Sequence, residues 1–199
     1  MTDNNFIIGS HTKDIDVFNS TKEAIIPFES LETKRLQKKA SPSEVECVYM
    51  KDISVYDPIN DSLNAEYPMR KDWWERKSRE GRKAFVSFND DNTLAALLIL
   101  KLENEEINSV PDLPNKKRLK ISTLKVSREG YGIGSQLIKK SIEEGIKNNV
   151  DEIYLTHYTK EVDRLVKLII KYGFEKVAVI KNEGKEDEDI YVKTINNII

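Results

Sequence analysis

The sequence contains little cysteine and little histidine, and both scarcities limit the chemistry that it can support. Of its 199 residues one is a cysteine, Cys47, and two are histidines, His11 and His157. A lone cysteine excludes an internal disulfide and a cysteine-cluster metal site, and fits a reducing compartment. Two histidines argue against a histidine-based zinc site. We therefore predict a cytoplasmic protein without a metal centre.

The sequence also lacks long apolar runs and an excess of charge of one sign. No run approaches the length of a membrane span, and the N-terminus lacks the basic-then-apolar layout of a secretory signal. The 32 basic and 34 acidic residues give a net charge of -2, which offers no general electrostatic case for nucleic-acid binding. The basic run "NKKRLK" (115–120) is interpreted as solvated loop charge. We expect no membrane and no nucleic-acid partner.

The distribution of polar residues divides the chain near residue 45. Residues 1–44 are polar and only weakly periodic, so we interpret them as an N-terminal extension with a short helix near 30–39. From residue 45 the pattern becomes regular, and 45–199 is long enough to form one domain with its own core.

The regular region predicts an α+β fold around one mixed sheet. An early hairpin followed by a strand–helix–strand crossover favours this class. Residues 105–117, rich in proline, asparagine and charge, are interpreted as a loop. The predicted strands are 45–53, 82–88, 93–103, 118–126, 151–158, 175–182 and 190–195, and the predicted helices are 70–81, 133–148 and 160–172.

Three of the chain's eight glycines, Gly130, Gly132 and Gly134, lie between a predicted strand and a predicted helix. A dinucleotide-binding fingerprint would need its third glycine where Ser135 stands, and an acid after the next strand, whereas Asp151 precedes that strand. A P-loop would need a Lys-Ser or Lys-Thr pair, which is missing. A turn without a ligand stays open, although so many glycines cost more backbone entropy than a plain turn requires.

Three short segments resemble the Gcn5-related N-acetyltransferase (GNAT) family. "EGYGIG" (129–134) is similar to the family's pyrophosphate loop, "LKV" (124–126) to the end of its fourth strand, and "YGF" (172–174) to its Gly-Phe after a helix. The order of strands and helices from 45 to 195 also matches the family. The resemblance implies a mixed, mostly antiparallel sheet flanked by helices, with acetyl-CoA as cofactor. Consecutive N–H groups at a helix N-terminus would hold its pyrophosphate.

The resemblance also implies which residues contact coenzyme A. Glu129 stands where the family usually has Arg or Gln, and a carboxylate there is unfavourable beside a pyrophosphate. Arg128, one residue earlier, would supply the missing positive charge. Leu124 and Val126 would hold the pantetheine arm, and the pyrophosphate would be bound by Arg128, Gly130, Tyr131, Gly132, Ile133, Gly134 and Ser135.

The general acid of the family is replaced in this sequence. Ile169 occupies the position at which many members have a tyrosine that protonates the leaving thiolate. The resemblance implies Tyr172, three residues later, or Tyr158, at the end of the preceding strand, as the substitute. The alternative is that Tyr172 is an aromatic residue at the edge of the core and Tyr158 a loop residue.

The general base of some members is also absent. Lys120 and Ser122 occupy the fourth-strand positions at which those members have a glutamate. Glu103, beside Glu105 and Glu106 at the end of the third strand, is the nearest alternative by topology and could accept the amine's proton directly or through water. A solvated acidic loop is the competing interpretation.

Four further residues outside the glycine-rich segment are interpreted from the sequence. His157 could act as a base, or could be a satisfied polar histidine. Trp73 and Trp74 cannot share one helix face, so one is expected in the core and the other in an acceptor cleft or on a partner surface. Cys47 is expected to be a small buried residue of the first strand.

The resemblance as a whole implies an N-acyltransferase that moves an acetyl or other acyl group from acetyl-CoA to a primary amine. The amine acceptor is unknown, and a homodimer is left open. The missing tyrosine and glutamate motivate an alternative, a non-catalytic GNAT-fold protein that serves as an acyl-CoA sensor or an interaction module.

Overall fold

The computed structural model describes residues 44–67, 69–127, 132–184 and 186–195. Their contacts form two compact units. The first contains the described residues up to Leu97 together with those from Lys125 to Ile133, and the second contains Leu98–Leu124 and the described residues from Gly134 onward. The predicted helix near 30–39 lies outside the described residues, and the division at residue 44 stays a prediction.

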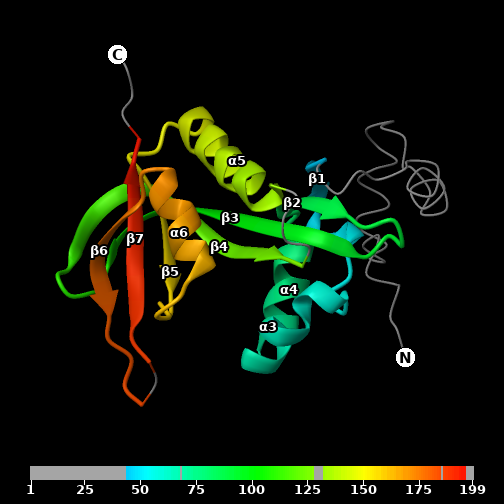
Figure 1. Ribbon diagram of the computed structural model, residues 1–199, viewed down its shortest axis with the longest axis horizontal. Coiled ribbons are helices and arrows are strands. Elements are labelled where there is room, and N and C mark those ends of the chain that lie inside the picture. The colour runs from blue at the N-terminus through cyan, green and yellow to red at the C-terminus, as the bar shows by residue number, and fades with distance from the viewer. Residues whose placement is uncertain (1–43, 68, 128–131, 185, 196–199) are drawn as a thin grey trace. The chain divides into compact units, whose positions relative to one another are not determined.

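The described strands form one seven-stranded sheet in the order β1-β2-β3-β4-β5-β7-β6. The β4–β5 pair is parallel, while the β1–β2, β5–β7 and β7–β6 pairs are antiparallel. The predicted mixed, mostly antiparallel sheet with flanking helices is therefore confirmed (Figure 1). The strands are β1 (Glu46–Tyr49), β2 (Lys83–Phe88), β3 (Leu94–Ile107), β4 (Leu113–Val126), β5 (Glu152–His157), β6 (Glu175–Ile180) and β7 (Glu188–Thr194).

The first unit contains the helices α3 (Asp61–Glu66) and α4 (Arg70–Arg79), after the 3-10 turns η1 (Met50–Asp52) and η2 (Pro58–Asn60). The helix predicted over 70–81 is confirmed as α4, which packs against η1 and α3. Its Trp74 and the Met50 of η1 are fully buried. Helix α3 was not predicted, because its six residues carry too few apolar side chains to show a helical period.

The second unit contains the crossover from β4 through α5 (Ile133–Lys147) to β5, followed by α6 (Arg164–Lys171), β6 and β7. Helix α5 lies close to β5, since a Cβ added at Gly145 would stand 2.7 Å from Ile153 Cδ1. Helix α6 begins later than the predicted residue 160, because the Asp163 side chain accepts the backbone N–H of Val166 and caps the helix there.

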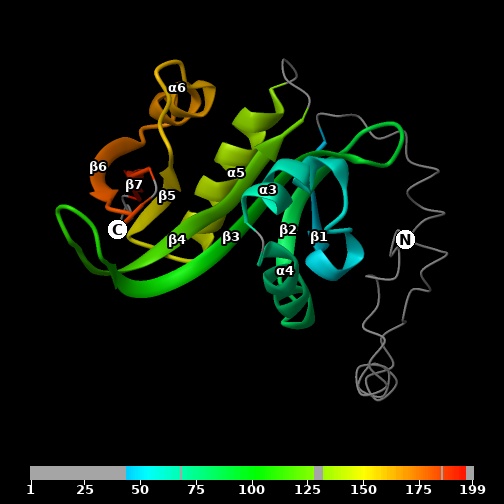
Figure 2. The ribbon, with the colours of Figure 1, turned by 90° about the horizontal axis from the view of Figure 1, so that it is seen from below.

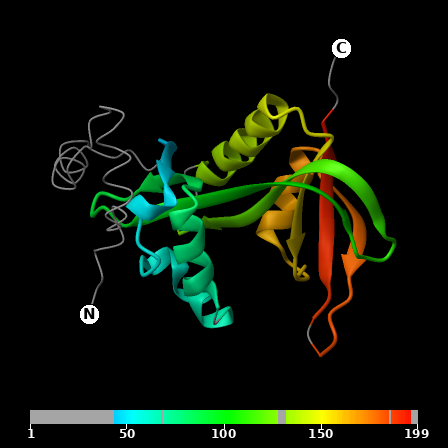
Figure 3. The ribbon, with the colours of Figure 1, turned by 180° about the vertical axis from the view of Figure 1, so that it is seen from behind.

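The prediction of a loop over 105–117 was largely wrong, because β3 and β4 extend as a long hairpin through most of it. Ile107 and Leu113 pack against the buried cluster of Tyr154, Ala178, Ile190 and Val192 in the second unit. The hairpin also bridges β6, since the Val110 N–H donates to the Val179 carbonyl at 2.8 Å and the reverse bond measures 3.1 Å. Figures 2 and 3 show this hairpin curving toward β6.

A buried arginine, Arg118, fastens the extended hairpin to β5. Arg118 is 1 % exposed, and its Nε donates to Glu152 Oε2 at 2.8 Å. Its other nitrogens donate to the carbonyls of Glu105 at 3.1 Å and Pro114 at 2.8 Å, and Lys116 pairs with the same Glu152. The interpretation of "NKKRLK" as solvated loop charge was therefore wrong for Arg118.

Two further properties of the described residues concern exposure. Cys47, predicted to be buried, is exposed, because the alternation along β1 turns Glu46 and Val48 inward instead. None of the helices in the described ranges is long and apolar enough to cross a membrane.

Candidate functional site

The strand and the helix predicted around the glycine-rich segment are confirmed as β4 and α5. Four residues of the segment, 128–131, lie outside the described residues, and with them the predicted ligands Arg128, Gly130 and Tyr131. After β4 ends, the Ser127 N–H still donates to the Ala95 carbonyl at 2.9 Å. The chain therefore stays paired with β3 up to the residue before the segment.

The start of α5 has the properties of an anion-binding helix terminus. Gly132 has a φ of +71°, and a Cβ placed there would meet no atom within 4 Å. This position therefore needs glycine for its left-handed backbone, while the space beside it is open. Ile133 is 1 % exposed and anchors the helix start, and Gly134 and Ser135 follow. The first turn carries no acidic residue, so the helix dipole and the free N–H groups favour a negative ligand.

The end of β4 carries the two residues predicted to hold pantetheine. Leu124 and Val126 are half-buried and lie on the same face of the strand, because side chains alternate along it. Lys125 lies on the other face, where its Nζ donates to Ser62 Oγ of α3 at 2.6 Å. The charged side chain of Lys125 is therefore held away from the strand face that carries Leu124 and Val126.

The carboxyl end of β5 carries a histidine held by an aspartate. His157 Nε2 lies 2.6 Å from Asp163 Oδ2. Burial raises the pKa of Asp163, but the N–H groups of Val166 and Lys160 and the His157 contact outweigh it, so the pKa lies below its ordinary value. An ionised Asp163 favours the proton on Nε2, which leaves Nδ1 as the acceptor nitrogen. The His157 side chain is 27 % exposed.

His157 is therefore oriented and partly accessible, which is what a general base requires. His157 was interpreted as a possible base from the sequence, whereas Asp163 was not identified. The signal was present: an aspartate six residues after the histidine, directly before an apolar helical run, is a typical N-cap.

The two predicted tyrosines flank α6 in the sequence, with Tyr158 before the helix and Tyr172 at its end. Tyr158 follows His157, and its hydroxyl donates to Glu188 Oε1 at 3.1 Å. Tyr172 is the half-buried residue at which α6 ends, roughly 13 Å along the helix axis from Asp163 at 1.5 Å per residue. Ile169, at the position of the family's tyrosine, is fully buried. Tyr158 is adjacent in sequence to His157, whose side chain contacts Asp163, whereas Tyr172 lies at the other end of α6.

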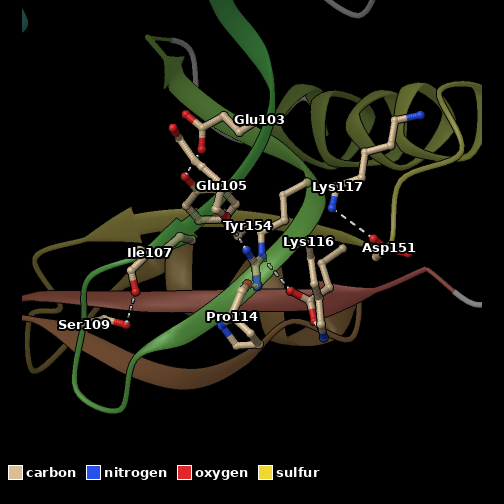
Figure 4. Close-up of polar contacts among 11 residues, drawn as sticks. Glu103, Glu105, Ile107, Ser109, Pro114, Lys116, Lys117, Asp151 and Tyr154 are labelled. Atoms are coloured by element: carbon tan, nitrogen blue, oxygen red, sulfur yellow. Dashed lines mark hydrogen bonds and ion pairs between the residues drawn. The ribbon is translucent and has the colours of Figure 1, made fainter.

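Glu103 forms a separate pair on β3 (Figure 4). It is 9 % exposed, accepts the Tyr154 hydroxyl, and accepts Lys101 Nζ at 2.5 Å. Burial raises the pKa of Glu103, but the hydrogen bonds from Lys101 and Tyr154 lower it by more. Side chains alternate along β5, so Tyr154 and His157 point to opposite faces. The structure does not bring Glu103 and His157 together.

The paired tryptophans differ in burial as predicted. Trp74 is fully buried, whereas Trp73 is half-buried, and their ring centroids lie 6.4 Å apart in an edge-on arrangement. The core assignment is confirmed for Trp74.

No family model and no curated protein matches the sequence. Solved structures are similar in fold. Naa50 of Arabidopsis thaliana, in complex with the bisubstrate analogue CoA-Ac-MVNAL, has a TM-score of 0.56 and 24% identity, covering 78% of this chain and 100% of that one. Ard1 from Thermoplasma volcanium has 0.57 and 15%, covering 79% and 100%. A ribosomal-protein-alanine N-acetyltransferase from Brucella melitensis has 0.55 and 18%, covering 76% and 99%.

Proposed function

Because the chain has the fold of the Gcn5-related N-acetyltransferases, we propose that it transfers an acetyl or other acyl group from acetyl-CoA to an amine acceptor. The observation that carries this proposal is the start of α5. A left-handed, open Gly132 precedes a buried Ile133 in a first turn without acidic residues. These features fit a bound pyrophosphate better than a turn without a ligand.

We assign the donor contacts to β4 and to the turn after it. Leu124 and Val126 would contact the pantetheine arm, and the backbone of Gly130, Tyr131, Gly132, Ile133, Gly134 and Ser135 would bind the pyrophosphate, with Arg128 adding a positive charge. The alternative, binding without transfer, needs the same contacts. The two functions differ only in the residues that move protons.

The transfer itself requires two proton movements. The amine nitrogen attacks the thioester carbonyl, a C–N bond forms, the C–S bond breaks, and the thiolate leaves. The amine must lose one proton, and the thiolate takes up one proton. We propose His157 as the acceptor of the amine's proton, directly or through water, with Asp163 positioning it, and Tyr158 as the proton donor to the thiolate.

Tyr172 and Glu103 remain secondary proposals for the acid and the base. Tyr172 lies at the far end of α6 from Asp163, and Glu103 is committed to Lys101 and Tyr154. Both observations make them weaker candidates than the residues at the end of β5.

Two isosteric substitutions at Gly132 test donor binding. Asn and Asp both tolerate a left-handed backbone and differ only in charge, so the aspartate adds repulsion against a pyrophosphate. By isothermal titration with coenzyme A, we expect Gly132→Asp to bind at least about tenfold more weakly than Gly132→Asn. Gly81→Asn is the matched control, since Gly81 has a φ of +70° and equally open space. No binding by the native chain, or equal affinities of the two Gly132 variants, would contradict the proposal.

Substitution of His157 tests the chemistry. Thiol release from acetyl-CoA with a panel of amines should fall by about 10²–10⁴-fold in His157→Gln, since a general base is lost, while coenzyme A affinity is retained. We expect a smaller loss in Asp163→Asn, which keeps the helix cap, and little change in Tyr172→Phe. Full activity of His157→Gln would refute its role. Binding without transfer to any amine would favour the sensor.

A further inference from the structure

The first residue of α4, Arg70, is a buried cation with few partners. It is 9 % exposed, and its Nη2 donates to the buried Asn60 Oδ1 at 3.1 Å. Its guanidinium carbon lies 5.6 Å and 5.5 Å from the ring centroids of Trp73 and Trp74. Its Nε is buried and makes no hydrogen bond within the described part of the chain, and no described carboxylate forms an ion pair with it.

The unsatisfied polar atoms of the first unit gather around the same helix pair. Among described residues, the buried side-chain nitrogens and oxygens without a hydrogen-bond partner are Asn64 Oδ1, Arg70 Nε, Trp74 Nε1 and Ser78 Oγ, and all lie on α3 or α4. Buried polar groups are nearly always satisfied in native proteins, so each orphan requires a water or a ligand.

Arg70 and Trp74 stand one turn apart on the buried face of α4 and contribute two N–H donors that lack acceptors. Aromatic faces attract a guanidinium, but they accept its N–H groups much more weakly than an oxygen does. Burial without a counter-charge also lowers the pKa of Arg70 to about 10. A water molecule would satisfy a donor but leave the charge uncompensated, whereas an anionic oxygen would do both.

The surroundings also favour an anion. Arg70 begins α4, and the N-cap residue, Met69, supplies no side-chain hydrogen bond, so the positive end of the helix dipole adds to the guanidinium. The first turn also contains one acidic residue, Asp72, which is exposed to solvent. Met69 is 70% exposed and Tyr67 is 47% exposed, which places the covered arginine beside the surface. The neighbouring cation, Lys71, lies over the Tyr56 ring at 4.5 Å. The single unpaired charge of the Arg70 guanidinium would be balanced by a planar anion that carries one negative charge.

We propose that Arg70, together with Trp74, forms a binding site for the carboxylate group of a small ligand. The planar guanidinium fork matches a carboxylate, and the Trp74 N–H is a further donor to it. This binding site does not depend on acyl transfer.

A more specific form rests on the proposed function: the ligand is the amine acceptor, which carries a carboxylate. The hydrogen bond from Lys125 of β4 to Ser62 of α3 joins the helix pair to the strand assigned to the acyl donor. Arg70 lies on α4, which packs against α3, so an acceptor held at Arg70 would lie next to the helix that contacts that strand.

The chain's own tryptophans provide the test. Trp73 and Trp74 are its only two, and both rings lie against Arg70, so intrinsic fluorescence reports on this site. We expect N-acetylglycine to cause a saturable change at constant ionic strength and without coenzyme A, and the uncharged N-acetylglycine amide to cause none. Arg70→Gln should weaken the response at least about tenfold, by loss of a charge-assisted contact. Lys71→Gln, which removes the adjacent charge, should leave it unchanged.

A native chain without a saturable response, or an Arg70→Gln variant that responds equally, would overturn the site and assign the orphan donors to water. If a thermal unfolding scan shows that Arg70→Gln does not fold, the Trp74 Nε1–H resonance of the native chain decides. A shift with N-acetylglycine and not with its amide supports the site, and no shift overturns it. Binding that persists in a chain without transferase activity would refute the proposed function and leave the site intact.

Discussion

The two buried arginines among the described residues show opposite ways of placing a cation inside a protein. Arg118, in the second unit, is 1 % exposed and donates to one carboxylate and two backbone carbonyls. Arg70, in the first unit, is 9 % exposed. It donates to one amide oxygen, and its guanidinium lies near two tryptophan rings. Burial is therefore similar, while satisfaction of the N–H groups differs greatly.

This difference separates a structural cation from a candidate binding group. A buried charge that is paired by groups of its own chain has no capacity left for a ligand. When such a charge is removed, the charge of its partner stays buried and unpaired in the low-dielectric interior. A buried charge that is only partly paired retains donors that an external oxygen can satisfy. The contrast predicts that Arg118 matters for stability and Arg70 for binding.

The largest expected effect is on the stability of the second unit. Arg118→Met should lower the free energy of unfolding by about 3–5 kcal/mol, because it breaks a buried ion pair and orphans two carbonyls. Urea unfolding followed by circular dichroism measures this change. Lys116→Met is the control, since Lys116 is the half-exposed partner of the same Glu152 and should cost less than about 1 kcal/mol. Similar losses in both variants would contradict the distinction.

The next effect concerns acid. Burial raises the pKa of Glu152, but the hydrogen bonds and charges of Lys116 and Arg118 lower it by more, so it lies below the ordinary value of 4.5. A carboxyl with a lowered folded-state pKa contributes full stability above its ordinary value and loses it as pH falls through the folded-state value. Unfolding midpoints between pH 7 and pH 3 should therefore decline less steeply in Glu152→Gln than in the native chain.

Glu161→Gln is the matched control for this measurement. Glu161 precedes the capping residue of α6 and is exposed, whereas Glu152 is buried. Its acid profile should follow that of the native chain. A Glu152→Gln profile that also follows the native one would show that the Arg118 pair does not set the acid response.

The smallest expected effect is the one that sharpens the comparison most. Arg70→Met should change the free energy of unfolding by about 1 kcal/mol or less, because the loss of one hydrogen bond to Asn60 is offset by removal of an unpaired buried charge. The same urea assay measures it. A loss as large as that of Arg118→Met would identify Arg70 as a structural residue and remove the reason to treat the two arginines differently.

The sequence predicted the elements whose periodicity is long and uninterrupted. Helix α5, with Ile133, Leu137 and Ile138 all buried, and strand β3, with its continuous apolar start, follow directly from such patterns. The short α3 and the polar extension of the β3–β4 hairpin did not, since their stability comes from partners distant in sequence, such as Glu152 for Arg118.

The candidate site was predictable to the same extent. The glycine segment could be recognised because its chemistry is local: a strand, a turn and a helix start are contiguous. The His157–Asp163 pair depended on where a helix begins, which one side-chain cap decides. Neither arginine could be distinguished from a surface cation, because both stand in segments, "RKDWW" and "NKKRLK", whose charged residues indicate solvent exposure when the sequence alone is considered.

The bridge between Val110 and Val179 has a consequence for self-association. In the described sheet β6 is a terminal strand, and a terminal strand offers unpaired backbone groups to a strand of another molecule. The tip of the hairpin occupies those groups at Val179, where β6 would otherwise continue an open edge. The hairpin thus satisfies the outward-facing backbone groups of Val179, and at that residue β6 has none left for pairing with a second copy of the chain.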